Sequence, residues 1–211
     1  MLANGIAPRI QTFVNKRNIA QLPQVLRLIK NQEWEKRCGD IGREFSFFLH
    51  QGSCDGENRK LYDQWITRED IALIPEELEE MTLRYFGKGS MKEVLGQTEE
   101  ELYDWFLDDF STGDIVSEEP VFFIDSRFNV YPNYESPSPL WMLGNLKEDG
   151  AERVLECYAE KRSPAQHVLA SVPACELAKS CGHPHSHKLF GKWDYKNFLL
   201  EEYCRRLYIE N

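Results

Sequence analysis

The residues best suited to chemistry lie in one short segment, Cys175–His187, with the sequence CELAKSCGHPHSH. Its soft ligands are two cysteines and three histidines: Cys175, Cys181, His183, His185 and His187. Thiolate and imidazole are the ligands that zinc and iron sites use. One interpretation of the segment is therefore a zinc or iron site.

The same segment has an interpretation without a metal. Cys175 and Cys181 lie six positions apart on a helix expected at Pro173–Ser180, which puts the two thiols on different faces. A structural zinc site usually brings its cysteines closer together, on a turn. The alternating histidines would point the same way only in an extended segment, which Pro184 permits. The spacing favours two half-buried thiols followed by a polar loop.

A second polar group follows a strand expected at Glu44–His50. The loop reads HQGSCDG, and in α/β folds binding sites are built on such strand-end loops. His50, Gln51 and Asp55 supply polar groups, and the two glycines permit unusual backbone angles. The alternative is a polar turn with one incidental histidine.

The remaining cysteines are isolated in the sequence: Cys38, Cys54, Cys157 and Cys204. None of the six cysteines forms a CxxC pair, and in a cytoplasmic chain they indicate free thiols or metal ligands rather than disulfides. Cys54, in a loop, is expected to be exposed. The sequence contains no GxGxxG, P-loop, HExxH or GxSxG motif, which excludes the commonest nucleotide-binding and hydrolytic sites.

The composition is that of a folded protein with a sizeable core: 211 residues, 42% of them hydrophobic. The net charge of −10 argues against nucleic acid or an anionic membrane as the main partner. No apolar run approaches the ~18 residues of a membrane span. Because the first residues also lack a signal-peptide pattern, we expect a cytoplasmic protein.

The expected fold class is α/β, with α+β as the alternative. A strand at Arg9–Val14, a helix from Ile19 and the strand at Glu44–His50 form the unit of a parallel sheet. A capping box at Thr67–Asp70 predicts a helix that continues to about Tyr85.

A further helix is expected after Thr98, with an apolar side that includes Leu102 and Phe106. Its acidic residues are interpreted as a solvated face with a favourable helix-dipole interaction. These residues are Glu99, Glu100, Glu101, Asp104, Asp108 and Asp109.

The stretch Pro120–Leu146 organises the second half of the chain. Two apolar runs, Val121–Ile124 and Phe128–Tyr131, flank Asp125-Ser126-Arg127 and predict a β-hairpin. Several helices are expected beyond it. We therefore expect two regions, 1–114 and 115–211, with the boundary in the Ser-Thr-Gly-Asp segment that ends at position 114.

The second half of the chain resembles a region of radical S-adenosylmethionine (SAM) enzymes. The resemblance is to the start of their C-terminal auxiliary region, of SPASM or twitch type, and it rests on the order of a strand, a turn, NVYP, a loop and LGNL. The stretch Gly5–Ile71, notably PRIQTFVNKRNIAQLP and EFSFFLHQGSCDGENRKLY, resembles the last βα units of the barrel in that family. The chain departs from the family in two ways. Asn133 stands where the auxiliary region commonly has its first cluster-binding cysteine, and the main motif CxxxCxxC is absent.

The resemblance implies partial βα-barrel units followed by a hairpin and a helical region. It also implies S-adenosylmethionine and a [4Fe–4S] cluster as cofactors, and a peptide or protein as substrate. The loops that match the family's later barrel loops carry the residues expected to bind the cofactor: Asn15, Lys16, His50, Gln51 and Asp55. Without the cluster cysteines, this chain alone is not expected to perform the reaction.

Two hypotheses follow. In the first, the chain is the C-terminal part of a radical SAM enzyme whose N-terminal half lies elsewhere, and the strand at Arg9–Val14 has an exposed apolar edge. In the second, it is a stand-alone binding or scaffold module, and the chain or a second copy in a homo-oligomer covers that edge. A metal-binding form of the module would use the ligands near 175–187.

Overall fold

The computed structural model describes residues 4–54, 56–113, 120–132 and 138–209. Helices make up 52% and strands 12% of the chain, in small sheets, which confirms the α/β or α+β class. None of the sheets formed by these residues closes into a barrel.

The chain folds into two compact units, each assembled from separate segments. The first unit comprises Met1–Gly52, Asp63–Thr98 and His187–Gly191, and the second comprises Ser53–Tyr62, Glu99–Ser186 and Lys192–Asn211. The boundary expected near position 114 falls within Glu99–Ser186, a segment of the second unit. A late segment, His187–Gly191, belongs to the first unit, so the units do not correspond to two consecutive regions.

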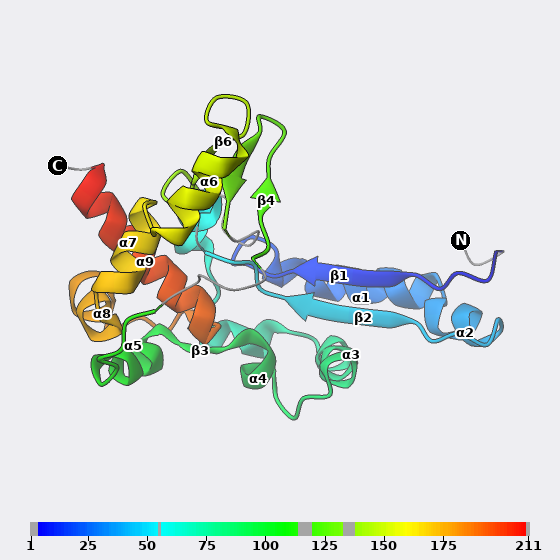
Figure 1. Ribbon diagram of the computed structural model, residues 1–211. Helices are drawn as coiled ribbons and strands as arrows, with labels where there is room; N and C mark the ends of the chain where they lie inside the picture. The colour runs from blue at the N-terminus through cyan, green and yellow to red at the C-terminus, as the bar shows by residue number, and fades with distance from the viewer. Residues whose placement is uncertain (1–3, 55, 114–119, 133–137, 210–211) are drawn as a thin grey trace. The chain divides into compact units, whose positions relative to one another are not determined.

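The first unit is built around two parallel strands, β1 (Arg9–Phe13) and β2 (Ser46–His50), which pair with Arg9 opposite Ser46. The connection between them contains a 3₁₀ turn at Ile19–Gln21 and two helices, α1 (Leu22–Asn31) and α2 (Trp34–Gly39). Figure 1 shows α1 alongside the two strands. Both strands and the helix that begins near Ile19 are therefore confirmed as a βαβ unit.

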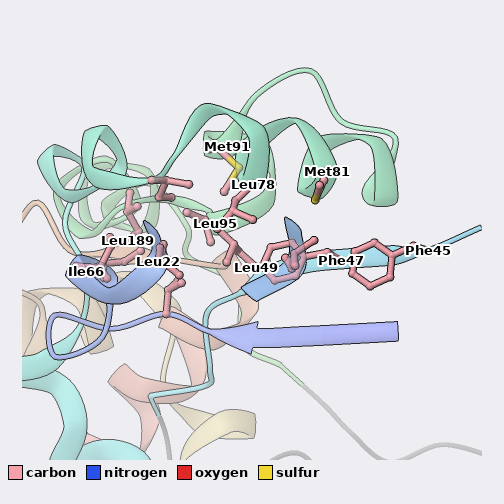
Figure 2. Close-up of a cluster of buried hydrophobic side chains, with 14 of the residues drawn as sticks. Leu22, Phe45, Phe47, Leu49, Ile66, Leu78, Met81, Met91, Leu95 and Leu189 are labelled. Carbon is pink, nitrogen blue, oxygen red and sulfur yellow. The ribbon is translucent and has the colours of Figure 1, made fainter. Parts of the chain in front are cut away.

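One face of this small sheet is packed, and the other is exposed along β1 but covered at Phe48 of β2. Phe47 and Leu49 are buried in a cluster with Leu22 and Ile29 of α1 (Figure 2). On the opposite face, side chains alternate outward along β1, and those of Arg9, Gln11 and Phe13 are exposed. Helix α1 thus covers one face of the pair, and on the other face the rings of Tyr85 and Phe86 pack on Phe48.

The helix expected from Thr67 to Tyr85 is in fact two elements, η4 (Glu69–Leu73) and α3 (Glu76–Phe86). Pro75 disfavours helical geometry at the residue before it, and Ile74 is accordingly extended, with ψ 125°. The expectation of one continuous helix was wrong for this reason. The end of α3 at Gly87, in left-handed geometry with φ 62°, is as expected.

A short helix and a small antiparallel pair complete the first unit. After α4 (Met91–Leu95), strand β3 (Gln97–Thr98) pairs with β7 (Leu189–Phe190) from late in the chain. Gly96 joins α4 to β3 with φ 100°, in a region that favours glycine.

The second unit contains a group of helices around α9 (Lys192–Tyr208). α9 contacts α5 (Glu99–Leu107), α7 (Pro164–Ser171) and α8 (Ala174–Cys181). Its inner face buries aromatic and leucine side chains, which accounts for the apolar spacing of this segment. Among the described residues, no helix has the length and apolar character needed to cross a membrane.

The second unit also contains an antiparallel sheet of β4 (Phe123–Ile124), β5 (Asn129–Tyr131) and β6 (Gly144–Asn145). Asp125 holds the hairpin turn, because its Oδ1 accepts hydrogen bonds from Arg127 N at 2.8 Å and Asn129 N at 3.0 Å. Helix α6 (Gly150–Ala159) packs on this sheet. The expected hairpin is therefore confirmed, while Asn133 lies outside the described residues.

Candidate functional site

The carboxyl ends of β1 and β2 meet at one end of the first unit, because the strands are parallel. Val14 N donates a hydrogen bond to His50 O at 2.9 Å, and this bond keeps the carboxyl ends of the two strands side by side. Four of the five residues expected to bind a cofactor follow these strand ends: Asn15, Lys16, His50 and Gln51. Asp55 lies outside the described residues.

The asparagine at this end shapes the loop after β1. Asn15 Oδ1 accepts hydrogen bonds from Arg17 N at 2.9 Å and Asn18 N at 3.2 Å, and Asn18 Oδ1 accepts one from Asn15 N at 2.9 Å. Because its acceptor oxygen is engaged by the loop, Asn15 positions its neighbours. Lys16 and Arg17 are exposed and present two cations beside the strand ends.

His50, the last residue of β2, and Gln51, which follows it, differ in how their polar atoms are engaged. The His50 ring packs edge-on against Phe13 with centroids 5.4 Å apart, and burial lowers the pKa of His50, so the imidazole is neutral at pH 7. Gln51 Nε2 donates to Leu189 O, while its buried Oε1 has no hydrogen-bond partner among the described residues. A neutral imidazole beside exposed cations can bind an anionic group such as a carboxylate.

The structure does not gather the cysteines and histidines of 175–187 around one point. Cys175 and Cys181 are buried within α8, whereas His183 and His185 are exposed after the helix ends. His187 belongs to the first unit, where its Nδ1 lies 2.7 Å from Glu69 Oε1. Across the described ranges, no group of three or more His, Cys, Asp or Glu side chains could hold a metal ion.

The residues present do not fit a [4Fe–4S] cluster, which needs several thiolates close together. All six cysteines are free, five of them are buried, and the CxxxCxxC motif is absent. Cys54 was expected to be exposed but is fully buried. Its loop is held down within the second unit, because Gly56 N donates to the buried Glu201 Oε2 at 2.6 Å. No step through a cluster can therefore be assigned to this chain.

The ion pair of His187 and Glu69 yields a testable prediction. Hydrogen bonds to its own backbone N–H, to the Thr67 hydroxyl and to His187 lower the pKa of Glu69 from 4.5 to about 2. The stabilisation is therefore present above pH 4.5 and is lost as the pH falls toward 2. We expect His187→Ala to raise the Glu69 pKa only part of the way to 4.5, since the first two causes remain.

The measurement is a carbon-detected NMR titration of the Glu69 carboxyl group. His185→Ala is the matched control, because it removes another exposed imidazole of the same segment and should leave the Glu69 pKa unchanged. An unchanged Glu69 pKa in His187→Ala would show that the imidazole does not stabilise the carboxylate.

The second unit contains a buried group that we call the Glu99 cluster: Glu99, Tyr62 and Tyr195. The Glu99 side chain is fully buried, and its Oε2 accepts a hydrogen bond from the Tyr62 hydroxyl at 2.5 Å. Burial, together with the Glu99 charge, raises the pKa of both tyrosines, so both phenols stay protonated. The Tyr62 ring stacks on Phe198 with centroids 5.1 Å apart. The cluster is a structural anchor for the start of α5.

Sequence reasoning missed this cluster, because it placed Glu99 on a solvated face. The signal was present in the helical spacing. Glu99, Leu102 and Phe106 fall on one side of α5 at intervals of three and four, and all three are buried. A glutamate in line with two core positions is a candidate buried carboxylate.

Comparisons of the chain with protein-family models, with curated proteins and with solved structures found no match. Its function is therefore inferred from the geometry of its own residues.

Proposed function

We propose that this chain is the C-terminal part of a radical SAM enzyme that modifies a peptide or protein, with the catalytic cluster held by another part of that protein. The observation that carries the proposal is the open outer edge of β1. Within the described residues, β1 pairs only with β2, and Phe13 on it is 54% exposed.

The hydrogen-bonding direction along β1 defines this edge. Val14 N donates to His50 O, so by strand alternation the N–H groups of Ile10 and Thr12 also face β2. Those of Gln11 and Phe13 face the other way. Parallel strands occur almost only in larger sheets that are covered on both faces, and a two-stranded sheet is marginal. The edge is therefore suited to pairing with a further strand.

The faces of the sheet support a barrel-type neighbour. A βα-barrel has helices on its outside and strand side chains on its inside, whereas a doubly wound sheet has helices on both faces. Here α1 packs against the face that carries Phe47 and Leu49. On the opposite face Arg9 and Gln11 are exposed, whereas Phe48 is covered by the ring of Tyr85. In the proposal, this face lines the interior of the completed barrel.

The candidate site lies where an enzyme of this architecture would use it. Barrel enzymes bind their ligands at the carboxyl ends of the strands. In the proposal, Lys16 and the neutral His50 contact an anionic group of the bound cofactor or substrate. The arrangement of β4, β5, β6 and α6 supports the assignment of the following region, since the resemblance implies a hairpin and helices there.

The alternative, a stand-alone binding or scaffold module, predicts that the edge of β1 is covered. Within the described part of the single chain it is not. A homo-oligomer formed through β1 would restore this alternative, so the edge itself needs a direct test.

Amide hydrogen exchange of the isolated chain provides that test. We expect the amides of Ile10 and Thr12 to be protected by β2, and those of Gln11 and Phe13 to exchange at least tenfold faster. NMR-detected exchange at two protein concentrations measures this. Equal protection of all four amides, especially if it increases with concentration, would show that the edge is covered.

The function itself is tested on the native protein. An antibody against this chain is used to purify the protein from its source cells under anaerobic conditions, and iron content and conversion of SAM to 5′-deoxyadenosine are measured after reduction. The proposal predicts iron and SAM cleavage. Native protein free of iron and unable to cleave SAM would contradict it.

A further inference from the structure

Strand β4 in the second unit has an open outer edge, because β5 pairs with β4 on one side and with β6 on the other (Figure 1). Asp125 N donates to Asn129 O at 3.1 Å, which fixes the direction of hydrogen bonding along β4. By strand alternation, the N–H and C=O groups of Phe123 face β5, and those of Phe122 and Ile124 face outward. These outward groups have no hydrogen-bond partner among the described residues, so the edge can pair with a further strand.

The side chains of this edge are apolar and exposed. Val121 is 67% exposed, Ile124 49% and Phe123 36%. Soluble proteins commonly protect an edge strand with a charged side chain, but positions 121–124 carry none. An exposed apolar edge of this kind is typical of an interaction surface.

The hairpin turn exposes a further aromatic side chain in a strained conformation. Phe128 ends the three-residue loop 126–128, and its N donates to Asp125 O at 3.0 Å. Its φ is 70°, the left-handed conformation for which such loops favour glycine, yet the residue is 40% exposed. Strained residues are concentrated at functional sites. We call the four exposed apolar residues the hairpin surface: Val121, Phe123, Ile124 and Phe128.

The turn end of the hairpin surface carries two cations. Lys147 Nζ lies 3.8 Å from the centroid of the Phe128 ring, and Arg127 is exposed in the turn itself. Neither cation forms an ion pair with any of the described residues. The neighbouring carboxylate of Asp125 is engaged by hydrogen bonds within the hairpin. This end of the surface is therefore suited to a carboxylate from a partner.

We propose that the hairpin surface binds an extended peptide with apolar side chains and an acidic residue near its N-terminus. The peptide adds a strand antiparallel to β4 and exchanges hydrogen bonds with Phe122 and Ile124. Because the added strand is antiparallel, its N-terminal end lies at the turn, where its carboxylate meets Arg127 and Lys147. Its apolar side chains cover the hairpin surface.

The charges favour such a peptide over a second copy of the chain. A copy paired through the same strand would bring its own hairpin, in which the carboxylate of Asp125 is already engaged. An acidic peptide supplies the free carboxylate that this hairpin lacks. Binding requires neither a cluster nor S-adenosylmethionine, so the inference is independent of the proposed function.

The test is an NMR titration of the isotope-labelled chain with the peptide acetyl-Glu-Val-Thr-Val-Thr-Val-amide. For a short peptide on an exposed edge, we expect a dissociation constant of about 1 mM. Near saturation the outward-facing amide of Ile124 should exchange with solvent about fivefold more slowly. The amide of Phe123, which already faces β5, should change little.

Two changes of charge test the contribution of the turn. A peptide with Gln in place of Glu should bind about threefold more weakly, as expected for the loss of an exposed ion pair. Arg127→Gln should remove most of this difference between the two peptides. Lys179→Gln, at an exposed cation on α8, is the matched control and should leave both affinities unchanged.

Phe128→Asn tests the exposed ring. Asparagine tolerates the left-handed conformation, so the turn should be retained, and an amide spectrum unchanged outside the turn shows that the variant is folded. Both peptides should bind about fivefold more weakly to this variant.

The proposal is overturned if the acidic peptide gives no saturable shifts in the hairpin, or if the two peptides bind equally well. Binding to Phe128→Asn as tight as to Lys179→Gln would also overturn it. So would protection of the Ile124 amide that increases with chain concentration in the absence of peptide, because a second copy would then cover the edge.

Discussion

Gly96→Ala is expected to destabilise the first unit by about 3–5 kcal/mol, enough to unfold a marginally stable domain. Gly96 has φ 100° and ψ −169°, a combination that L side chains rarely adopt. A Cβ added there would lie 2.0 Å from Phe190 O and 2.3 Å from Phe190 C. Both atoms are backbone in the partner strand β7, so the clash can be relieved only by separating β3 from β7.

Chemical denaturation, followed by the circular dichroism of the purified chain, measures this loss. Gly87→Ala is the matched control, because Gly87 also has positive φ, 62°, but an added Cβ would have no atom within 4 Å. It should cost only about 1 kcal/mol, the strain of a left-handed alanine. Equal losses in the two variants would show that backbone strain alone, and not the contact with Phe190, fixes glycine at position 96.

Glu99→Ala is expected to lower the free energy of unfolding by about 2–4 kcal/mol. Removing the carboxylate leaves the buried Tyr62 hydroxyl without its 2.5 Å acceptor and opens a cavity beside Tyr195. Glu99→Gln keeps an acceptor oxygen at the same place without the charge, so it should lose about half as much or less.

Asp104→Ala, at an exposed position of the same helix, is the control and should change stability by no more than about 0.5 kcal/mol. Denaturant unfolding monitored by tyrosine and tryptophan fluorescence compares the three variants. A loss in Glu99→Ala as small as that in Asp104→Ala would contradict the description of Glu99 as an anchor of the second unit.

Local patterns predicted the longer elements of this fold. β1 and β2 follow from alternation and from runs of β-branched and aromatic residues, and the long helix α9 follows from its apolar spacing. Pro75 was visible in the sequence, yet the capping box before it suggested one helix through it. The rule that a residue before proline avoids helical geometry would have given the correct break.

Long-range pairings could not be predicted from those patterns. β3 and β7 have two residues each and lie far apart in the chain, so neither carries a periodic signal. The position of α3 along the edge of β2 depends on contacts between distant segments, such as the hydrogen bond from Leu49 N to Thr82 Oγ1 and the stacking of Tyr85 on Phe48. Such a contact depends on tertiary packing, which local sequence does not encode.

One candidate site could be predicted from the sequence, and another could not. Parallel pairing alone brings the residues after β1 and β2 to one end of the sheet, so the strand-end site could be predicted from the order of elements. Whether the cysteines and histidines of 175–187 meet at one point could not be predicted from the sequence. It depends on how α8 packs and on His187 belonging to a different unit from Cys175.

The most direct test of the proposed function is the mass of the native polypeptide in its source cells, measured with an antibody against this chain. The proposal predicts a band well above the 24.7 kDa of this sequence, with upstream residues that contain the CxxxCxxC motif on peptide sequencing. A single band at 24.7 kDa would contradict it and leave a binding module as the function to pursue.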